Sequence, residues 1–282
     1  MGDAVLITGV TIGFGQEIAL SLAGRGFVVY AGIAHPNDAA QLHAAAAARG
    51  VSLHPLLLDV TDQESVDAGI HTILAQHGGI YGVVHNDFLF LRAYFEDFAD
   101  SEIRAVYESS LFGAMAVTRA ALPPMRAAGR GRIVLISSVA GRIAPATGSA
   151  YSSVRFAQEG FAEALSQEVK SFGIYVSLIE SGVVRAASWT VENSAAAAAR
   201  DSRSPYYLRF QQADKAFGRM LQSSVIRHEE IAQKVYTAMT APRPRLRYII
   251  GRKARIAIAL RRYLPDGLFE WLFFRTTRAA HM

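Results

Sequence analysis

The sequence contains no cysteine, which excludes disulfides, thiolate metal sites and cysteine nucleophiles. Its eight histidines show no HExxH or other close ligand spacing, so we expect no bound metal. No uninterrupted apolar run is long enough to span a bilayer, and the residues after Met1 lack the basic start and apolar stretch of a signal peptide. We therefore expect a soluble, folded protein of the cytoplasm.

Acidic residues are scarce in the last part of the chain. Residues 241–282 hold ten Lys or Arg and two Asp or Glu, a net charge of +8, whereas the whole chain carries +5. Residues 1–240 therefore carry −3, and the basic character belongs to the C-terminal segment. Its mixture of apolar residues and arginines suits peripheral contact with an anionic membrane, but equally a cap over a pocket or a subunit contact. Nucleic-acid binding is not expected because no recognised module is present.

Short β-rich runs alternate with longer helical patterns along the chain. The runs lie at 4–9, 27–32, 51–60, 80–86, 131–138, 174–181 and 246–251. Continuous apolar strands separated by helices indicate a parallel sheet covered on both faces, the doubly wound α/β architecture. We predict one domain, in which residues 1–240 form the main body and 241–282 add the last strand and a basic helical extension.

Two stretches interrupt this alternation. The helical pattern at about 100–128 contains Pro123 and Pro124, which predict a bend or break at that point. Residues 183–225 are too long for a simple connection, so we predict a partly helical lid. Trp189, Tyr206 and Tyr207 of this lid suggest an apolar substrate, although core packing explains them as well.

A glycine-rich sequence, TGVTIGFG, follows the first predicted strand. Gly9, Gly13 and Gly15 let the backbone turn tightly and approach a diphosphate, which the N-terminus of the next helix attracts. Because this loop joins the first strand to the first helix, we predict a dinucleotide site there. Thr11 and Ile12 lie in the same loop and are expected to contact the cofactor.

A serine, a tyrosine and an arginine form the candidate catalytic group. Ser138 ends a predicted strand thirteen residues before Tyr151, and Arg155 follows the tyrosine by four residues, so both lie on one helix face. A free phenol has a pKa near ~10, and an adjacent cation lowers it by roughly one to three units. Arg155 would therefore make Tyr151 a better proton-transfer group at neutral pH.

Together with the run LLDVT, these motifs make residues 4–182 resemble the short-chain dehydrogenase/reductase family. The C-terminal segment is similar, more weakly, to an extension of some steroid- and retinol-type members. The resemblance implies a single Rossmann domain with seven parallel strands, NAD or NADP as cofactor, and a homodimer or homotetramer. Asp59 and Val60 match the pair that touches the adenine in relatives, although Asp59 alone also suits a turn or a helix N-cap.

The resemblance also assigns roles to the catalytic group. In the family the tyrosine exchanges a proton with the substrate oxygen, the serine hydrogen-bonds that oxygen, and a lysine holds the nicotinamide ribose. Arg155 stands in the lysine position and can supply its charge, but an arginine does not easily release a proton. The family's proton relay also uses an asparagine, and Ser110 takes its position here. How Tyr151 regains its proton therefore stays open.

The fourth strand ends in a further departure from the family. Relatives have Asn-Asn-Ala-Gly where this chain reads His85-Asn86-Asp87-Phe88. Asn86 is kept and is expected at the cofactor, whereas a carboxylate near an anionic cofactor costs energy. Phe88 either packs into the core or narrows the site and meets the substrate. His85 suits an acid/base group or a merely hydrogen-bonded residue at a strand end.

The choice between the two cofactors is not predicted. An acid after the second strand would hold a ribose 2′-hydroxyl and an arginine would hold a 2′-phosphate, but Ala34 and His35 stand there. Relatives that prefer NADP often have a basic residue where this chain has Ile12. After the sixth strand relatives often have Pro-Gly, of which only Gly182 is present, preceded by Ser181.

Two functional readings follow. The first is an NAD(P)(H)-dependent enzyme that interconverts a carbonyl and a secondary alcohol on a hydrophobic small molecule. The second is an enzyme on the same scaffold that catalyses an isomerisation, dehydration or cyclisation, using Ser138, Tyr151 and either His85 or Asp87. An inactive homologue that binds a ligand or partner is the remaining reading.

Overall fold

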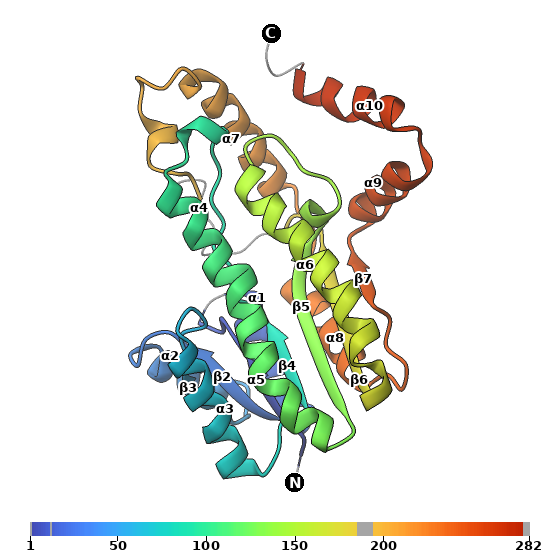
Figure 1. Cartoon of the computed structure of the whole chain (residues 1–282). Coiled ribbons are helices and arrows are strands. Elements are labelled where there is room, and N and C mark those ends of the chain that lie inside the picture. Colours follow the sequence, from blue (N-terminus) through green and yellow to red (C-terminus); the bar gives the residue numbers. More distant parts are fainter. Residues whose placement is uncertain (1, 12, 185–193, 279–282) are drawn as a thin grey trace.

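A seven-stranded parallel sheet forms the centre of the molecule in the computed structural model, which describes residues 2–11, 13–184 and 194–278, the last five by their backbone alone (Figure 1). The strand order is β3-β2-β1-β4-β5-β6-β7, and all neighbouring strands are parallel. The strands are β1 Ala4–Ile7, β2 Val28–Ile33, β3 His54–Leu57, β4 Gly82–His85, β5 Gly131–Ser138, β6 Ile174–Ser181 and β7 Arg247–Ile250. The predicted doubly wound fold is confirmed.

Helices cover both faces of the sheet (Figure 1). The helices are α1 Phe14–Ala23, α2 Asp38–Ala48, α3 Gln63–His77, α4 Asp100–Tyr107, α5 Gly113–Ala127, α6 Ser149–Glu168, α7 Tyr207–Gln222, α8 His228–Thr240, α9 Arg252–Tyr263 and α10 Asp266–Arg278. One apolar core lies under α1, α2 and α8, and a second lies under α3, α5 and α6. The predicted lid contains α7, so its partly helical character is confirmed.

Strand β1 shows why the strands read as continuous apolar runs. Val5 and Ile7 belong to the core under α1 and α8, whereas Ala4 and Leu6 belong to the opposite core. Alternate side chains of a strand point to opposite faces, so both sets must be apolar when helices cover both faces.

The break in the long helical pattern was placed wrongly. Pro123 and Pro124 lie within α5, which continues to Ala127. The interruption is instead a π-helical turn, Glu108–Phe112, between α4 and α5. Such turns insert one extra residue into a helix and often lie at functional sites. Here it carries Ser110, the residue in the family's relay position.

The C-terminal segment continues the sheet and then leaves it. Strand β7 pairs with β6 at the edge of the sheet, and α9 and α10 follow at the periphery of the molecule (Figure 1). Ile258 and Phe269 anchor these helices on Ile143, which lies just beyond β5. No helix in the described ranges has the length and apolar character needed to cross a membrane.

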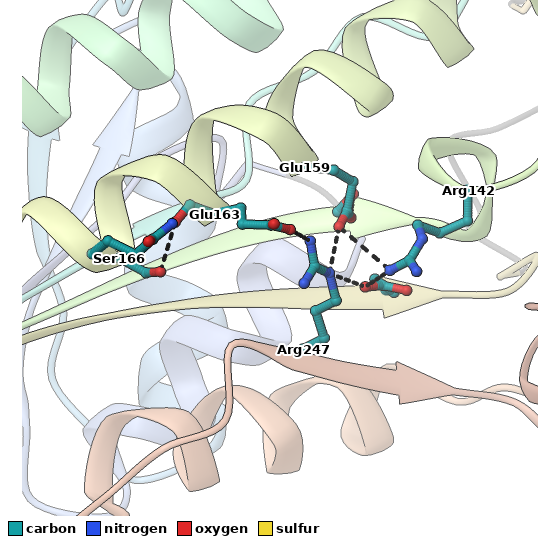
Figure 2. Close-up of polar contacts among 8 residues, drawn as sticks. Arg142, Glu159, Glu163, Ser166 and Arg247 are labelled. Carbon is teal, nitrogen blue, oxygen red and sulfur yellow. Dashed lines mark hydrogen bonds and ion pairs between the residues drawn. The ribbon is translucent and has the colours of Figure 1, made fainter. Parts of the chain in front are cut away.

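A network of charges around the buried Glu159 and Glu180 ties α6 to β6 and β7 (Figure 2). The Arg247 guanidinium contacts three carboxylates, those of Glu159 at 2.9 Å, Glu163 at 2.6 Å and Glu180 at 3.4 Å. Arg142 approaches Glu180 at 3.3 Å from the turn after β5. Burial raises the pKa of Glu180 to about 7, and the neighbouring Glu159 carboxylate adds to this rise.

Replacing Glu180 by glutamine is expected to stabilise the protein at high pH. A carboxyl whose pKa is raised in the folded state costs stability as pH rises from its unfolded value of 4.5 through 7. The unfolding free energy that Glu180→Gln gains over the wild type should therefore be larger at pH 8 than at pH 5.5, by roughly 1–3 kcal/mol. Melting temperatures of the two proteins at both pH values measure this difference.

Glu163→Gln is the matched control, because Arg247 lowers the pKa of the exposed Glu163 carboxyl. This variant should lose a little stability at high pH instead of gaining it. A melting temperature of Glu180→Gln that tracks the wild type at both pH values would contradict this account of Glu180.

Candidate active site

The glycine-rich loop is closed tightly against the end of β4. Gly9 and Gly13 have φ values of +63° and +70°, which favour glycine, and a side chain on Gly15 would collide with the Gly9 carbonyl oxygen. The Asn86 Nδ2 donates a hydrogen bond of 2.6 Å to that same carbonyl. The loop thus presents bare backbone at the start of α1, as a diphosphate site requires.

Several buried polar atoms near this loop lack hydrogen-bond partners among the described residues. They are Asn86 Oδ1, Asp87 Oδ2 and Arg155 Nε. Buried polar groups are normally paired, so such a set is what a polar ligand would satisfy. The loop and these atoms therefore fit a phosphate-bearing, hydroxyl-rich ligand such as a dinucleotide.

Asp87 is not an ordinary carboxylate. Burial raises its pKa to about 6, and the Asp59 charge adds to this effect, whereas a hydrogen bond with Thr8 opposes it. At mildly acidic pH the group is neutral and able to donate a hydrogen bond. The cost of placing an acid beside an anionic ligand is thereby reduced.

The residues predicted to hold the adenosine end of a cofactor lie at two turns, after β2 and after β3. Ala34 and His35 are exposed after β2. Asp59 is exposed and accepts hydrogen bonds from Thr61, at 2.9 Å from its N–H and 2.7 Å from its hydroxyl, so its carboxylate forms a turn. Val60 is buried.

The other residues predicted to bind the cofactor are Thr11, Ile12 and Gly182. Thr11 is half-buried in the glycine-rich loop, and Ile12 lies outside the described residues. Gly182 follows β6 and donates its N–H to Ile250 on β7 at 3.0 Å. The roles of these residues in cofactor binding remain predictions.

Tyr151 and Arg155 lie on one face of α6, as predicted. The guanidinium carbon of Arg155 lies 4.8 Å from the centre of the Tyr151 ring and 5.0 Å from that of Phe88. Arg155 is 2% exposed, and its Nη1 donates to the Ile136 carbonyl at 2.7 Å. The Tyr151 hydroxyl makes no hydrogen bond to a described residue and is therefore available to a ligand. The cation thus sits over the ring face and not at the oxygen.

Gln158 was not predicted from the sequence. Its Oε1 accepts a hydrogen bond of 2.8 Å from Arg155, and its Nε2 donates one of 2.7 Å to the backbone carbonyl of Ser110. The Ser110 hydroxyl, in turn, accepts from the N–H of Leu89 at 3.2 Å. One side-chain amide thus joins the catalytic helix to the π-helical turn.

Ser138 ends β5 and starts a tight turn. Its hydroxyl accepts a hydrogen bond of 3.2 Å from the N–H of Ala140. The turn packs directly on α6, because a side chain on Gly141 would approach the Arg155 carbonyl oxygen to 3.0 Å. Strand β5 and helix α6 therefore bring Ser138 and Tyr151 to the same end of the sheet.

Two phenylalanines after β4 lie against Tyr151 and Arg155. Phe88 lies under Arg155 and stacks on Phe14 of the glycine-rich loop, with ring centres 5.9 Å apart. Phe90 meets the Tyr151 ring edge-on at 4.7 Å and contacts Phe217 of α7 at 5.6 Å. Phe88 packs against the core under α1, α2 and α8, which is the first of its two expected outcomes. That its ring narrows the cofactor site and meets the substrate stays a prediction.

The role in substrate binding that was expected of Tyr206, Tyr207 and Trp189 stays a prediction. Tyr206 stacks on Tyr94 with ring centres 4.8 Å apart, Tyr207 is half-buried at the start of α7, and Trp189 lies outside the described residues. Phe217 of α7 contacts Phe90, which in turn contacts the ring of Tyr151.

An arginine fixes this lid to the body of the protein. Arg92 is buried and pairs with Asp214 of α7, and its guanidinium carbon lies 4.0 Å from the centre of the Phe217 ring. The ion pair therefore holds α7, and Phe217 with it, against the segment that carries Phe90.

The His85 side chain lies in the interior of the protein. It is buried at the end of β4, and its Nε2 lies 2.8 Å from the Thr118 hydroxyl on α5. Burial lowers the pKa of His85 to about 3, so the ring is uncharged at neutral pH. Of its two expected roles, this geometry matches the hydrogen-bonded residue.

Comparison with known proteins identifies the family. The sequence profile of the short chain dehydrogenase family matches residues 3–197. The chain belongs to this family. It is 31% identical to the uncharacterized oxidoreductase YusZ of Bacillus subtilis, covering 94% of this chain and 95% of the relative.

Two further family members cover nearly the whole chain. Retinol dehydrogenase 5 of Mus musculus is 30% identical over 98% of this chain and 90% of its own length. The crystal structure of a short-chain dehydrogenase from Streptomyces avermitilis superposes with a TM-score of 0.81 at 28% identity, covering 99% and 98% of the two chains. The family is one of oxidoreductases that use NAD(P), which agrees with the predicted enzyme class and cofactor.

Proposed function

We propose that this protein is an NAD(P)(H)-dependent oxidoreductase that interconverts a carbonyl and a secondary alcohol on a hydrophobic small molecule. One observation carries the proposal, namely a tyrosine hydroxyl without a hydrogen-bond partner among the described residues, on a ring that a buried guanidinium covers. Tyr151 is the acid/base group, Ser138 holds the substrate oxygen, and Arg155 supplies the charge.

Gly9, Gly13 and Gly15 would hold the diphosphate of the cofactor, and Asn86 and Arg155 would meet its ribose groups through their unpaired atoms. When bound, the nicotinamide supplies or accepts the hydride. Neither Ala34 nor His35 selects between NAD and NADP.

Arg155 is placed to assist Tyr151 by charge. At 4.8 Å and an effective dielectric constant near 20, a unit charge pair attracts by about 3 kcal/mol before desolvation costs. Negative charge that develops on a phenol during proton transfer spreads over its ring, so a cation above the ring face is well placed to stabilise it. Proton exchange between Tyr151 and a substrate oxygen is thereby made easier.

The route by which Tyr151 regains its proton differs from that of relatives with a lysine. The amide of Gln158 fills the step between Arg155 and the Ser110 carbonyl. Neither a guanidinium nor an amide releases a proton readily at neutral pH. We infer that protons reach the Tyr151 hydroxyl from the substrate side, because none of the described residues forms a hydrogen bond with it.

The substrate is expected to be apolar. Phe90 and Phe217 line the approach to Tyr151 with aromatic surface. A relative with similar coverage is a retinol dehydrogenase, whose named substrate is an extended apolar alcohol. Retinoid-like and other apolar ketones, aldehydes and secondary alcohols are therefore the first compounds to assay.

A non-redox reaction on the same scaffold is the second candidate, and Phe88 favours it. Its ring joins Phe14 of the glycine-rich loop to Arg155, on the route that a bound dinucleotide would follow between them. An enzyme that keeps Ser138 and Tyr151 but binds no cofactor would catalyse an isomerisation, dehydration or cyclisation.

Titration with NADH and NADPH, followed by a panel of apolar ketones, separates the two. Binding with turnover supports the redox function. Turnover without a cofactor that is lost in Tyr151→Phe supports the non-redox function. Failure of both cofactors to bind at millimolar concentration would overturn the redox proposal.

Phe88→Gly, which restores the small residue of relatives, is expected to tighten NADH or NADPH binding about tenfold. The variant should also melt at a lower temperature, because the stacking of Phe88 on Phe14 and Arg155 contributes about 1 kcal/mol or more. Calorimetric titration measures the first effect and thermal melting the second. Phe112→Gly is a control, because Phe112 is exposed on the π-helical turn. Unchanged or weaker cofactor binding in Phe88→Gly would mean that the ring does not narrow the site.

Cofactor binding is also expected to weaken with pH because of Asp87. Its pKa of about 6 means that the group gains a negative charge as pH rises through 6, next to the anionic diphosphate. The dissociation constant should rise by about tenfold from pH 5 to pH 7.5, which corresponds to ~1.4 kcal/mol. Asp87→Asn should show little of this dependence, and an equally steep dependence in that variant would assign it to another group.

Membrane contact and self-association form a separate proposal. Exposed apolar side chains gather on α9 and α10, among them Tyr263 at 77% and Trp271 at 54% exposure, beside several arginines. We propose that these helices make peripheral contact with anionic membranes and that the protein forms a homodimer or homotetramer. Vesicle flotation and light scattering test the two statements separately.

A further inference from the structure

A hollow lies beside the edge strand β7, between α8 and the start of α9. Its cavity volume is about 390 Å³, and it is lined by Lys234, Arg245, Arg247, Tyr248, Ile249 and Arg255. Four of these six side chains are cationic and none is acidic. The basic character noted in the C-terminal sequence is therefore gathered here into one concave place.

Three of the cations have no carboxylate within ion-pairing distance among the described residues. They are Lys234 of α8, Arg245 before β7 and Arg255 of α9, which come from three separate elements. Arg255 spends one donor on the Ile249 carbonyl at 3.4 Å. Arg247 differs, because its guanidinium is shared by Glu159, Glu163 and Glu180. Uncompensated like charges around one cavity repel each other, and a bound anion would relieve that repulsion.

The edge of the sheet adds neutral donors to this cavity. The backbone carbonyls of Leu246 and Ile250 accept hydrogen bonds of 2.6 and 3.0 Å from β6 and from the residue just after it. The backbone polar groups of the even-numbered residues therefore face β6. The N–H groups of Arg247 and Ile249 therefore point outward, to the open edge where the hollow lies. The Tyr248 hydroxyl accepts from the N–H of Arg245 at 3.0 Å and keeps its own proton to donate.

We propose that this hollow is a binding site for a phosphate-bearing anion, distinct from the glycine-rich loop. The lining combines three cations without acidic partners among the described residues, outward backbone N–H groups and a hydroxyl, and none of its six side chains is a carboxylate. Several convergent donors of this kind suit an oxoanion carrying more than one charge. Both a soluble phosphate ester and a phospholipid headgroup carry this chemistry.

The test is a titration of the whole protein with inorganic phosphate and pyrophosphate at constant ionic strength, followed by calorimetry. The double variant Lys234→Ala/Arg255→Ala should weaken binding at least tenfold. The matched control is Arg252→Ala/Lys253→Ala, which removes two exposed cations of α9 that do not line the hollow. This control should leave binding within about twofold of the wild type. Phosphate held at the glycine-rich loop is common to all three proteins and cancels in the comparison.

A second arm distinguishes the source of the phosphate. Flotation with phosphatidylcholine vesicles, with and without phosphatidic acid, is run on the same three proteins. Selective loss in the double variant with soluble phosphates supports a small-molecule site, and selective loss with phosphatidic acid alone supports a lipid headgroup. Equal weakening in the double variant and in the control would reduce the effect to diffuse charge and overturn the proposal, as would the absence of binding in both arms.

Discussion

Tyr151→Phe is expected to lower turnover by about 10²–10⁴-fold and to leave the melting temperature nearly unchanged. The hydroxyl makes no hydrogen bond to a described residue, so its removal strands no polar partner. The ring keeps its contacts with Phe90 and with the Arg155 guanidinium, because both involve the ring and not the oxygen. A large effect on activity combined with a small effect on stability is the signature of a group whose partner is the substrate.

Tyr107→Phe is the matched control for this result. Its hydroxyl donates to Ser153 on the same helix α6, at 2.8 Å, so the variant loses a hydrogen bond close to the site but no proposed proton-transfer group. It should cost some stability and leave turnover within a few-fold of the wild type. Tyr151→Phe with more than a tenth of wild-type turnover would remove Tyr151 from the acid/base role.

The parts of the fold and site that depend on local patterns could be predicted from the sequence. Strand β1 is apolar throughout because helices cover both its faces, and that pattern alone indicates a doubly wound sheet. The four-residue spacing of Tyr151 and Arg155 places both on one side of α6, and the glycine spacing reflects the positive φ values of Gly9 and Gly13.

The parts that depend on contacts between distant elements could not be predicted. Gln158 donates to the backbone carbonyl of Ser110, which lies 48 residues earlier in the sequence. Ser110 belongs to the π-helical turn, which no pattern in the sequence indicates. The prolines drew the expected break to the wrong end of the helical pattern, because Pro123 and Pro124 fit into the last turns of α5. The two aromatic residues Phe88 and Phe90 are visible in the sequence after β4. Their meaning appears only when that segment is set against α6, where Phe88 meets Arg155 and Phe90 meets Tyr151.

Arg155→Met is expected to affect stability and catalysis together. The variant leaves the Ile136 carbonyl and Gln158 Oε1 buried without their donor, and each such loss costs about 1–3 kcal/mol. It also removes the cation that lies over the Tyr151 ring, so turnover should fall by about tenfold or more through the loss of charge assistance. Turnover at a fixed pH and thermal melting measure the two effects.

Arg155→Lys separates the two effects, because a lysine keeps the positive charge but cannot reproduce the geometry of the guanidinium. Its turnover should lie within a few-fold of the wild type, while its melting temperature falls between those of the wild type and Arg155→Met. A Gln158→Met variant extends the test, since it removes the amide that holds Arg155 but leaves the charge, and it should lower the melting temperature while keeping most of the turnover. If Arg155→Met kept wild-type turnover, or if Arg155→Lys lost as much turnover as Arg155→Met, the charge assistance proposed for Tyr151 would be wrong.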